Sequence, residues 1–219
     1  MTRAAWPATA SVAAVLIGGA LFAGAYDLGP LSGQMALHIA LMNVAAPIGA
    51  ILLTRQAAAA GAPDRAATLW VAAAIQMVLL WAWHAPSLQR HAMDSHAVQA
   101  VMHASLLAAA FCFWREILRA ASRWHAIAVL LLTGKFACLL AVLLIFAPRL
   151  LYDFPAHGPF AGAHGALAPI ADQQLAGLLM AAACPLSFVV AGVIVAAQAI
   201  GDMGAASDPS RRRPFPAAR

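Results

Sequence analysis

The chain has 219 residues, of which 63% are hydrophobic and only 10% are charged, and its mean hydropathy is +0.81. Soluble domains carry about 25% charged residues, so this composition excludes a soluble domain and predicts a polytopic membrane protein. The net charge of +5 does not indicate a nucleic-acid partner, because the arginines follow a pattern of membrane topology.

Six windows are long and apolar enough to cross a membrane as helices: 8–26, 35–53, 67–86, 97–114, 126–148 and 173–200. Ala- and Leu-rich runs without strand-like alternation favour an all-α membrane bundle of about six transmembrane helices over a β-barrel. We expect a single transmembrane domain over residues 1–200 and a disordered, basic cytoplasmic tail over 201–219. The first window also fits a cleavable signal peptide, although we favour an uncleaved helix.

The arginines predict the orientation in the membrane. Segments with a positive excess face the cytoplasm, so both termini are expected inside. The loops on the other side carry only Arg90 and Arg149, and they are expected to face the periplasm of a bacterial inner membrane. The arginines expected on the cytoplasmic side are Arg3, Arg55, Arg65, Arg115, Arg119, Arg123, Arg211, Arg212, Arg213 and Arg219.

The second window carries soft metal ligands on one face. Met35, His38 and Met42 are spaced i, i+3 and i+7, which places them on one side of a helix. This helix is expected to enter from the outside near Gln34, with His38 about 5–6 Å below its outer end.

The stretch from Trp81 to His103 joins the third window to the fourth and holds four of the eight histidines. Trp81 and Trp83 are typical of an interfacial aromatic belt, and Pro86 is expected to end the third helix. His96 and His103 are separated by about 10.5 Å along the fourth helix, too far to bind one ion as a pair. A metal site must therefore draw on neighbouring helices, for instance through His38, His84 and His103, which are expected at similar depth.

The last two windows carry isolated polar groups. A lysine at a helix centre costs about 2.5–3.5 kcal/mol, so Lys135 should face the bundle or a partner, or extend toward the inner interface. Asp172 suits the amino end of the last helix, with a ligand or a catalytic acid as alternatives, and Pro185 is expected to kink this helix. The thiols show no disulfide or zinc-binding spacing: Cys112, Cys138 and Cys184.

The histidines predict a metal site on the outer side. Seven of the eight map to the outer half or the outer loops, and only His125 lies on the inner side. Imidazole binds copper, zinc, iron and nickel, whereas thioethers select Cu(I), so the sequence favours copper. We expect His91, His157 and His164 to be solvated. The candidate metal ligands are His38, His84, His103, His96, Met35, Met42 and Asp172.

Other functions stay open at this point. His38 and His103 could be hydrogen-bonded pins between helices, or axial ligands of a haem in a membrane electron carrier. Histidines with Lys135 and Gln76 could line a small transporter, or the chain could be a metal-free assembly scaffold. No nucleophile–base set, phosphate loop or metallopeptidase motif is present in the sequence.

Several segments resemble the CtaG family of integral-membrane cytochrome c oxidase assembly factors. They are MALHIALMNVAAP at 35–47, WAWHAP at 81–86, His103 followed by Phe113-Trp114, APRLLY at 147–152 and DQQLAGLLM at 172–180. The resemblance covers residues 34–182, and DQQLAG before an apolar helix is its most specific part.

The resemblance implies a copper chaperone for a haem–copper oxidase, not an enzyme, with oxidase subunits and possibly a periplasmic copper donor as partners. A homo-oligomer is compatible with it. By motif position, it implies functional roles for His38, His84, His103, Asp172 and Gln173. Where many members carry a further histidine one turn before each helix histidine, this chain has Gln34 and Gln99.

Overall fold

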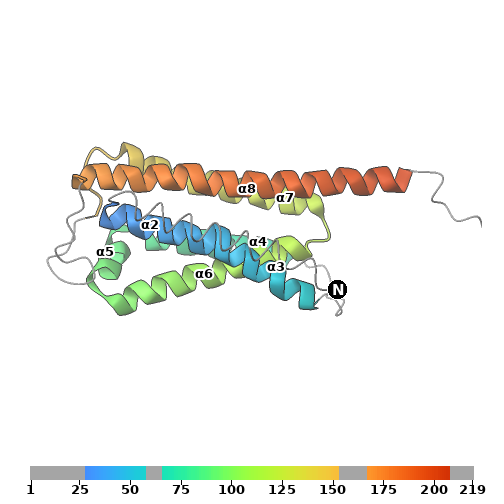
Figure 1. Cartoon of the computed structure of the whole chain (residues 1–219), viewed down its shortest axis with the longest axis horizontal. Helices are drawn as coiled ribbons and strands as arrows, with labels where there is room; N and C mark the ends of the chain where they lie inside the picture. Colours follow the sequence, from blue (N-terminus) through green and yellow to red (C-terminus); the bar gives the residue numbers. More distant parts are fainter. Residues whose placement is uncertain (1–27, 58–65, 153–166, 208–219) are drawn as a thin grey trace, which may run out of the picture.

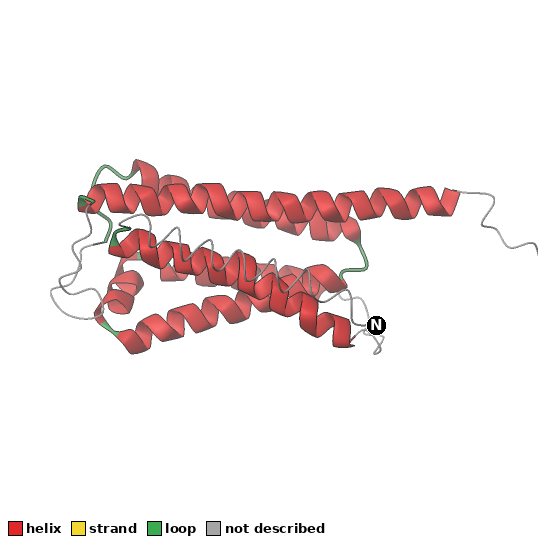
Figure 2. Ribbon diagram, in the orientation of Figure 1, coloured by secondary structure: helices red, strands yellow, loops and turns green. Residues whose placement is uncertain are grey.

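The computed structural model describes residues 28–57, 66–152 and 167–207, which form helices joined by short loops (Figures 1 and 2). The elements are α2 (Pro30–Ala40), η1 (Leu41–Ala45), α3 (Ala46–Ala57), α4 (Ala66–Trp83), α5 (Pro86–Asp94), α6 (His96–Arg119), α7 (Arg123–Phe146) and α8 (Pro169–Ser207). Within these residues, five segments are long and apolar enough to cross a membrane. The predicted all-α membrane bundle is therefore confirmed, and its first window, 8–26, lies outside the described residues.

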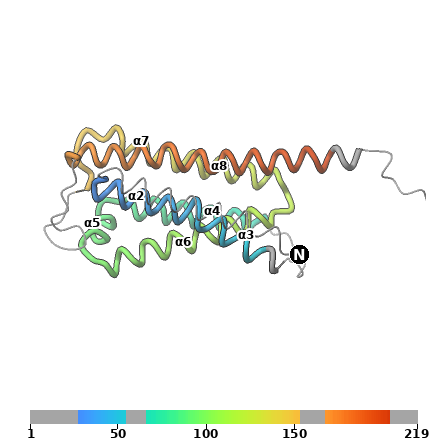
Figure 3. The backbone as a smooth tube through the Cα atoms, viewed as in Figure 1, coloured from blue at the N-terminus to red at the C-terminus, as the bar shows by residue number. Residues whose placement is uncertain are grey.

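The membrane-spanning helices run lengthwise in the bundle (Figure 3), and each packs mainly against two others, so that together they close a ring. The continuous α2–η1–α3 unit packs on α6, α6 on α4, α4 on α7, α7 on α8, and α8 returns to α2. The buried side chains at the centre include Met102, Phe113, Leu130, Leu144 and Met180. One end of this helix ring carries α5, the start of α2 and residues 147–152, and we call it the α5 end (Figure 1).

The α2–η1–α3 unit contains a π-helical segment just before Pro47. Proline has no backbone N–H, so it cannot donate to the carbonyl five residues earlier, which would be its partner in a π-helix and here belongs to Met42. The carbonyl of Met42, inside this segment, instead accepts a hydrogen bond from Trp114 Nε1 at 3.0 Å. This hydrogen bond links α6 to the π-helical segment.

The stretch between the third and fourth windows contains a short helix rather than a simple loop. α4 ends at Trp83, and Pro86 begins the nine-residue helix α5. Proline is well suited to a first helical position because its missing N–H would have no helical partner there. α5 packs on α6 and α4 and covers one end of the ring.

The last helix is longer than predicted. α8 has 39 residues, which corresponds to about 58 Å, whereas a bilayer core is about 30 Å thick. It extends past the start of α7 (Figure 1) and includes Pro185 without ending there. Residues 201–207, which we expected in a disordered tail, are helical, and residues 208–219 lie outside the described residues.

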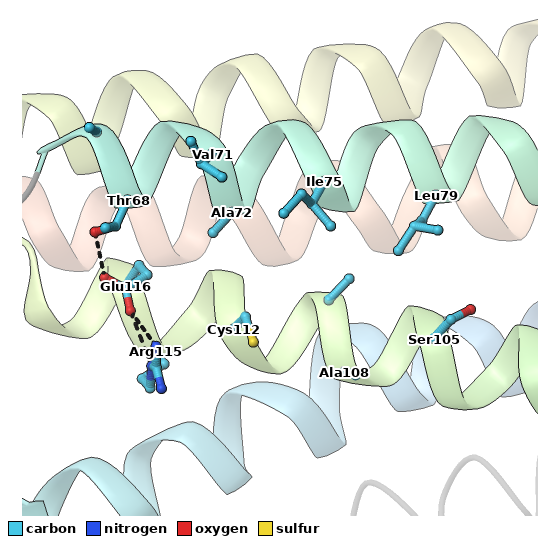
Figure 4. Close-up of a pocket in the computed structure, with 12 residues that line it drawn as sticks. Thr68, Val71, Ala72, Ile75, Leu79, Ser105, Ala108, Cys112, Arg115 and Glu116 are labelled. Atoms are coloured by element: carbon cyan, nitrogen blue, oxygen red, sulfur yellow. Dashed lines mark hydrogen bonds and ion pairs between the residues drawn. The ribbon is translucent and has the colours of Figure 1, made fainter.

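An apolar groove of about 500 Å³ lies between α4 and α6 (Figure 4). Small side chains such as Ala108 and Cys112 line its α6 side, which lets another helix or a lipid chain approach closely. At one end, Thr68 Oγ1 donates to Glu116 Oε2 at 3.0 Å, and Arg115 pairs with the same carboxylate at 2.9 Å. The exposed thiol of Cys112 therefore faces this groove rather than the core.

Candidate functional site

Three histidines from three segments meet near the α5 end. His38 comes from α2, His84 directly follows α4, and His103 lies in the second turn of α6. The ring centroids of His38 and His103 are 4.9 Å apart, and those of His38 and His84 are 6.0 Å apart. The prediction that these side chains lie at similar depth agrees with this arrangement, which we call the imidazole cluster.

The ring nitrogens of the imidazole cluster are only partly satisfied. Both nitrogens of His38 and Nε2 of His103 are buried without a hydrogen-bond partner among the described residues. In contrast, Nδ1 of His84 lies 2.7 Å from the carbonyl of Leu80. Because a carbonyl can only accept, Nδ1 must donate, and Nε2 of His84 keeps its lone pair.

Burial keeps His84 in the form that binds metals. Desolvation lowers the pKa of His84 from its ordinary value, so the ring is neutral at physiological pH. A neutral imidazole with one nitrogen fixed by a carbonyl is the usual state of a metal-binding histidine.

The imidazole cluster is not a preformed coordination sphere. Within the described parts of the chain, no three His, Cys, Asp or Glu side chains are arranged so that they could hold an ion together. The ring centroids of His84 and His103 nevertheless both lie within 6.0 Å of the His38 ring.

Asp172 holds the start of α2. Its two carboxylate oxygens accept hydrogen bonds from the backbone N–H groups of Leu31 and Ser32, at 2.9 and 3.0 Å. The Asp172 side chain is 1% exposed, and a side chain at Gly29 would overlap its carboxylate. Asp172 lies in the first turn of α8, at the amino end where the sequence predicted it, but in this structure its carboxylate caps a different helix.

Gln173 holds the segment that follows α7. Its side-chain oxygen accepts from the N–H of Leu151 at 2.7 Å, and Nε2 donates to the carbonyls of Leu144 and Arg149. The next residue in this segment, Tyr152, donates its hydroxyl to the backbone carbonyl of His84 at 2.8 Å. The first turn of α8 therefore supports both His38, through α2, and His84, through Tyr152.

Tyr152 was not recognised in the sequence as a supporting residue. Burial raises the pKa of Tyr152 to about 12, so the phenol remains protonated and continues to donate to His84. The sequence offered one signal, the APRLLY segment, but no pattern in it predicts a contact with a residue 68 positions earlier.

A layer of amide and thioether groups lies between α2, α5 and α6. Gln89 Nε2 donates to Gln34 Oε1 at 3.2 Å, and Gln34 Nε2 lies 3.6 Å from the sulfur of Met102. Met93 and Met102 are fully buried. Gln34 thus joins α2 to both α5 and α6, one turn before His38.

The remaining predicted site residues are more dispersed. Met35 and Met42 are buried in the core, whereas His96 is exposed at the start of α6. His91 and His125 are exposed as well, and His157 and His164 lie outside the described residues. Lys135 is exposed on α7 while Gln76 is buried, so these two do not line a common path in the described structure.

Residues 2–202 match the family described as the cytochrome c oxidase caa3 assembly factor. The match covers most of the chain and includes all three histidines of the cluster. The chain belongs to this family. The CtaG resemblance noted in the sequence is thereby confirmed, as is an association with oxidase assembly. No curated protein and no solved structure matches the chain.

Proposed function

We propose that this chain is a non-catalytic assembly factor that binds Cu(I) at the imidazole cluster and delivers it to a haem–copper oxidase. The observation that carries the proposal is the convergence of His38, His84 and His103, with both nitrogens of His38 unpartnered. In this proposal the α5 end faces the periplasm, where a copper donor and the oxidase subunits would meet it.

Unpartnered buried nitrogens support a ligand at this position. A buried polar atom without a hydrogen bond costs about 1–3 kcal/mol, so a ring with two such atoms is expensive unless something binds it. Imidazole nitrogens suit copper, and thioether sulfurs favour Cu(I); Met102, the buried chain neighbour of His103, is one such sulfur. A loosely arranged donor set also allows the ion to leave toward a better-formed acceptor site.

The ring contact supports copper rather than the haem alternative. In a bis-histidine haem the porphyrin plane lies between the two imidazoles. The rings of His38 and His103 are in contact, with centroids 4.9 Å apart and planes inclined by 35°, so a macrocycle would bind between them only after the rings had moved apart.

A copper measurement on detergent-purified protein tests the proposal. We expect about one equivalent of copper in the wild type and in His125→Ala, whose ring is exposed at the other end of the bundle. His38→Ala and His103→Ala should each lower the copper content, and oxidase activity should fall with it. Unchanged copper in both variants would refute copper binding at the cluster.

The metal-free scaffold is the second candidate, because the chain belongs to an assembly-factor family and exposes broad apolar helix faces. This candidate predicts that oxidase subunits co-purify with a variant lacking all three cluster histidines. If the subunits are captured and no copper is found in any form of the protein, the scaffold replaces the copper proposal.

A further inference from the structure

Lys135 is an exposed cation in the middle of a membrane-spanning helix. α7 runs from Arg123 to Phe146, so Lys135 lies about 18 Å from one end of the helix and about 16.5 Å from the other. The hydrocarbon core of a bilayer is about 30 Å thick, so each interface is about 15 Å from its centre. The four-carbon stem of lysine is much shorter than this distance, and the ammonium group therefore stays within the apolar layer.

The surface around Lys135 offers no opposite charge. Its neighbours one turn away on the exposed face of α7 are Leu131, Leu132 and Leu139, which are 53%, 45% and 50% exposed. Neither of the ion pairs found in the described residues involves Lys135. Ionisable groups inside a membrane usually face the bundle interior or a water-filled cavity, or pair with one another. Lys135 points out of the bundle, so an opposite charge outside the described bundle is the means left to stabilise it.

The sequence shows that this chain does not supply the opposite charge. It has eight acidic residues, and none of them lies within any of the six apolar windows. This includes the first window, 8–26, which therefore offers no carboxylate to Lys135. A second copy of the chain is excluded for the same reason, because its acidic residues also lie outside the windows. The partner of Lys135 must belong to a different protein.

We propose that the exposed face of α7 binds a transmembrane helix of another protein that carries an aspartate or glutamate near its centre. The carboxylate pairs with Lys135, and the leucines on either side pack against apolar side chains of the partner helix. A charge left alone in the apolar layer is costly, whereas opposite charges attract strongly there, so the surface selects a helix with an acid at this depth.

This surface is separate from the imidazole cluster, and the inference does not depend on copper binding. Lys135 belongs to α7, whereas the cluster histidines come from α2, α6 and the residue after α4. Such a surface would let an oxidase assembly factor recognise a membrane-embedded subunit by its buried acid.

Energy transfer in liposomes between the labelled full chain and a synthetic transmembrane peptide tests the proposal. The probe is a helix of leucine and alanine with one central glutamate, and the control peptide has glutamine in its place. Lys135→Gln removes the charge of the chain, and Lys135→Glu reverses it. Leu139→Trp adds bulk to the proposed face. Ile75→Trp is its matched control, because Ile75 is also 50% exposed but lies in the groove between α4 and α6.

The wild type and Ile75→Trp should bind the glutamate peptide at least about fivefold more tightly than the glutamine peptide, as expected for one polar contact between transmembrane helices. Lys135→Gln should lose this preference, and Lys135→Glu should instead prefer a peptide with a central lysine. Leu139→Trp should bind the glutamate peptide more weakly than Ile75→Trp does.

Two results would overturn the proposal. Equal binding of both peptides by the wild type would show that Lys135 does not recognise a carboxylate on a neighbouring helix. Weaker binding in Ile75→Trp but not in Leu139→Trp would place the peptide in the groove between α4 and α6. If Leu139→Trp does not fold, the exchange of charge at Lys135 decides alone. The readout contains no copper, so it is independent of the test of the imidazole cluster.

Discussion

Asp172 links α8 to α2 through hydrogen bonds to backbone amides of α2, not through a contact with another side chain. The start of a helix carries free N–H groups and a partial positive charge, so a buried carboxylate is stabilised there. Both oxygens are used, and hydrogen bonds to a charged group contribute about 1.5–3 kcal/mol each. The position of α2, and with it His38, therefore depends on one residue at the start of α8.

Gly29 makes this cap possible, and its replacement tests the cap. In Gly29→Ala the new methyl group would overlap the Asp172 carboxylate, so α2 or α8 must shift. We expect a loss of about 1–3 kcal/mol, the range for overpacking a tight site. Thermal unfolding in detergent would show it as a lower midpoint.

Gly33 provides the matched control one turn later in α2. A Cβ at Gly33 meets nothing within 4 Å, and alanine is about 1 kcal/mol more favourable than glycine inside a helix. Gly33→Ala should therefore be neutral or stabilising. Equal midpoints for the two alanine variants would show that the close approach to Asp172 is not essential.

At the scale of elements, Gln173 links α8 to the end of α7 and to the segment that carries Tyr152. Gln173→Ala removes three hydrogen bonds and leaves the N–H of Leu151 without its acceptor. We expect amide hydrogen exchange at residues 149–152 to accelerate by about tenfold or more, since an unmade buried bond costs about 1–3 kcal/mol. The neighbouring Gln174 is exposed, so Gln174→Ala should leave exchange unchanged. Similar exchange rates in both variants would show that Gln173 does not hold residues 149–152 in place.

The elements that the sequence predicted best are those defined by length and hydropathy. The windows after the first correspond to membrane-spanning segments, because about 20 apolar residues have few alternatives to a transmembrane helix. α5 was not predicted, since it is only nine residues long and lies in the polar stretch between two apolar windows. The π-helical segment and the extension of α8 were not predicted either, because they depend on tertiary contacts and on weak local preferences.

The candidate site was predictable only in part for a related reason. His38, His84 and His103 could be grouped because ionisable residues at equal depth in a membrane tend to meet. The supporting contacts were not predictable: Asp172 bonds to residues 140 and 141 positions away, and Tyr152 to one 68 positions away. Such pairs require the helix order around the ring, which no local pattern contains.

At the scale of the whole molecule, charge separates the two ends of the bundle. Arg115, Arg119 and Arg123 lie around the loop between α6 and α7, whereas the described part of the α5 end has only Arg90 and Arg149. The positive-inside rule therefore predicts that the imidazole cluster lies on the outward-facing side. Copper delivery in the periplasm requires this orientation, so the topology can be tested before any metal is measured.

Cysteine labelling in spheroplasts tests this orientation directly. In a background with Cys112, Cys138 and Cys184 replaced by serine, we expect His91→Cys to react with a membrane-impermeant maleimide in intact spheroplasts. Trp124 lies at the opposite end and is 69% exposed. Trp124→Cys should therefore react only after lysis. The reverse pattern would place the cluster on the cytoplasmic side, where delivery to a periplasmic acceptor is impossible. Because both positions are exposed and neither contributes to the imidazole cluster, the labelling reports topology whether or not copper binds.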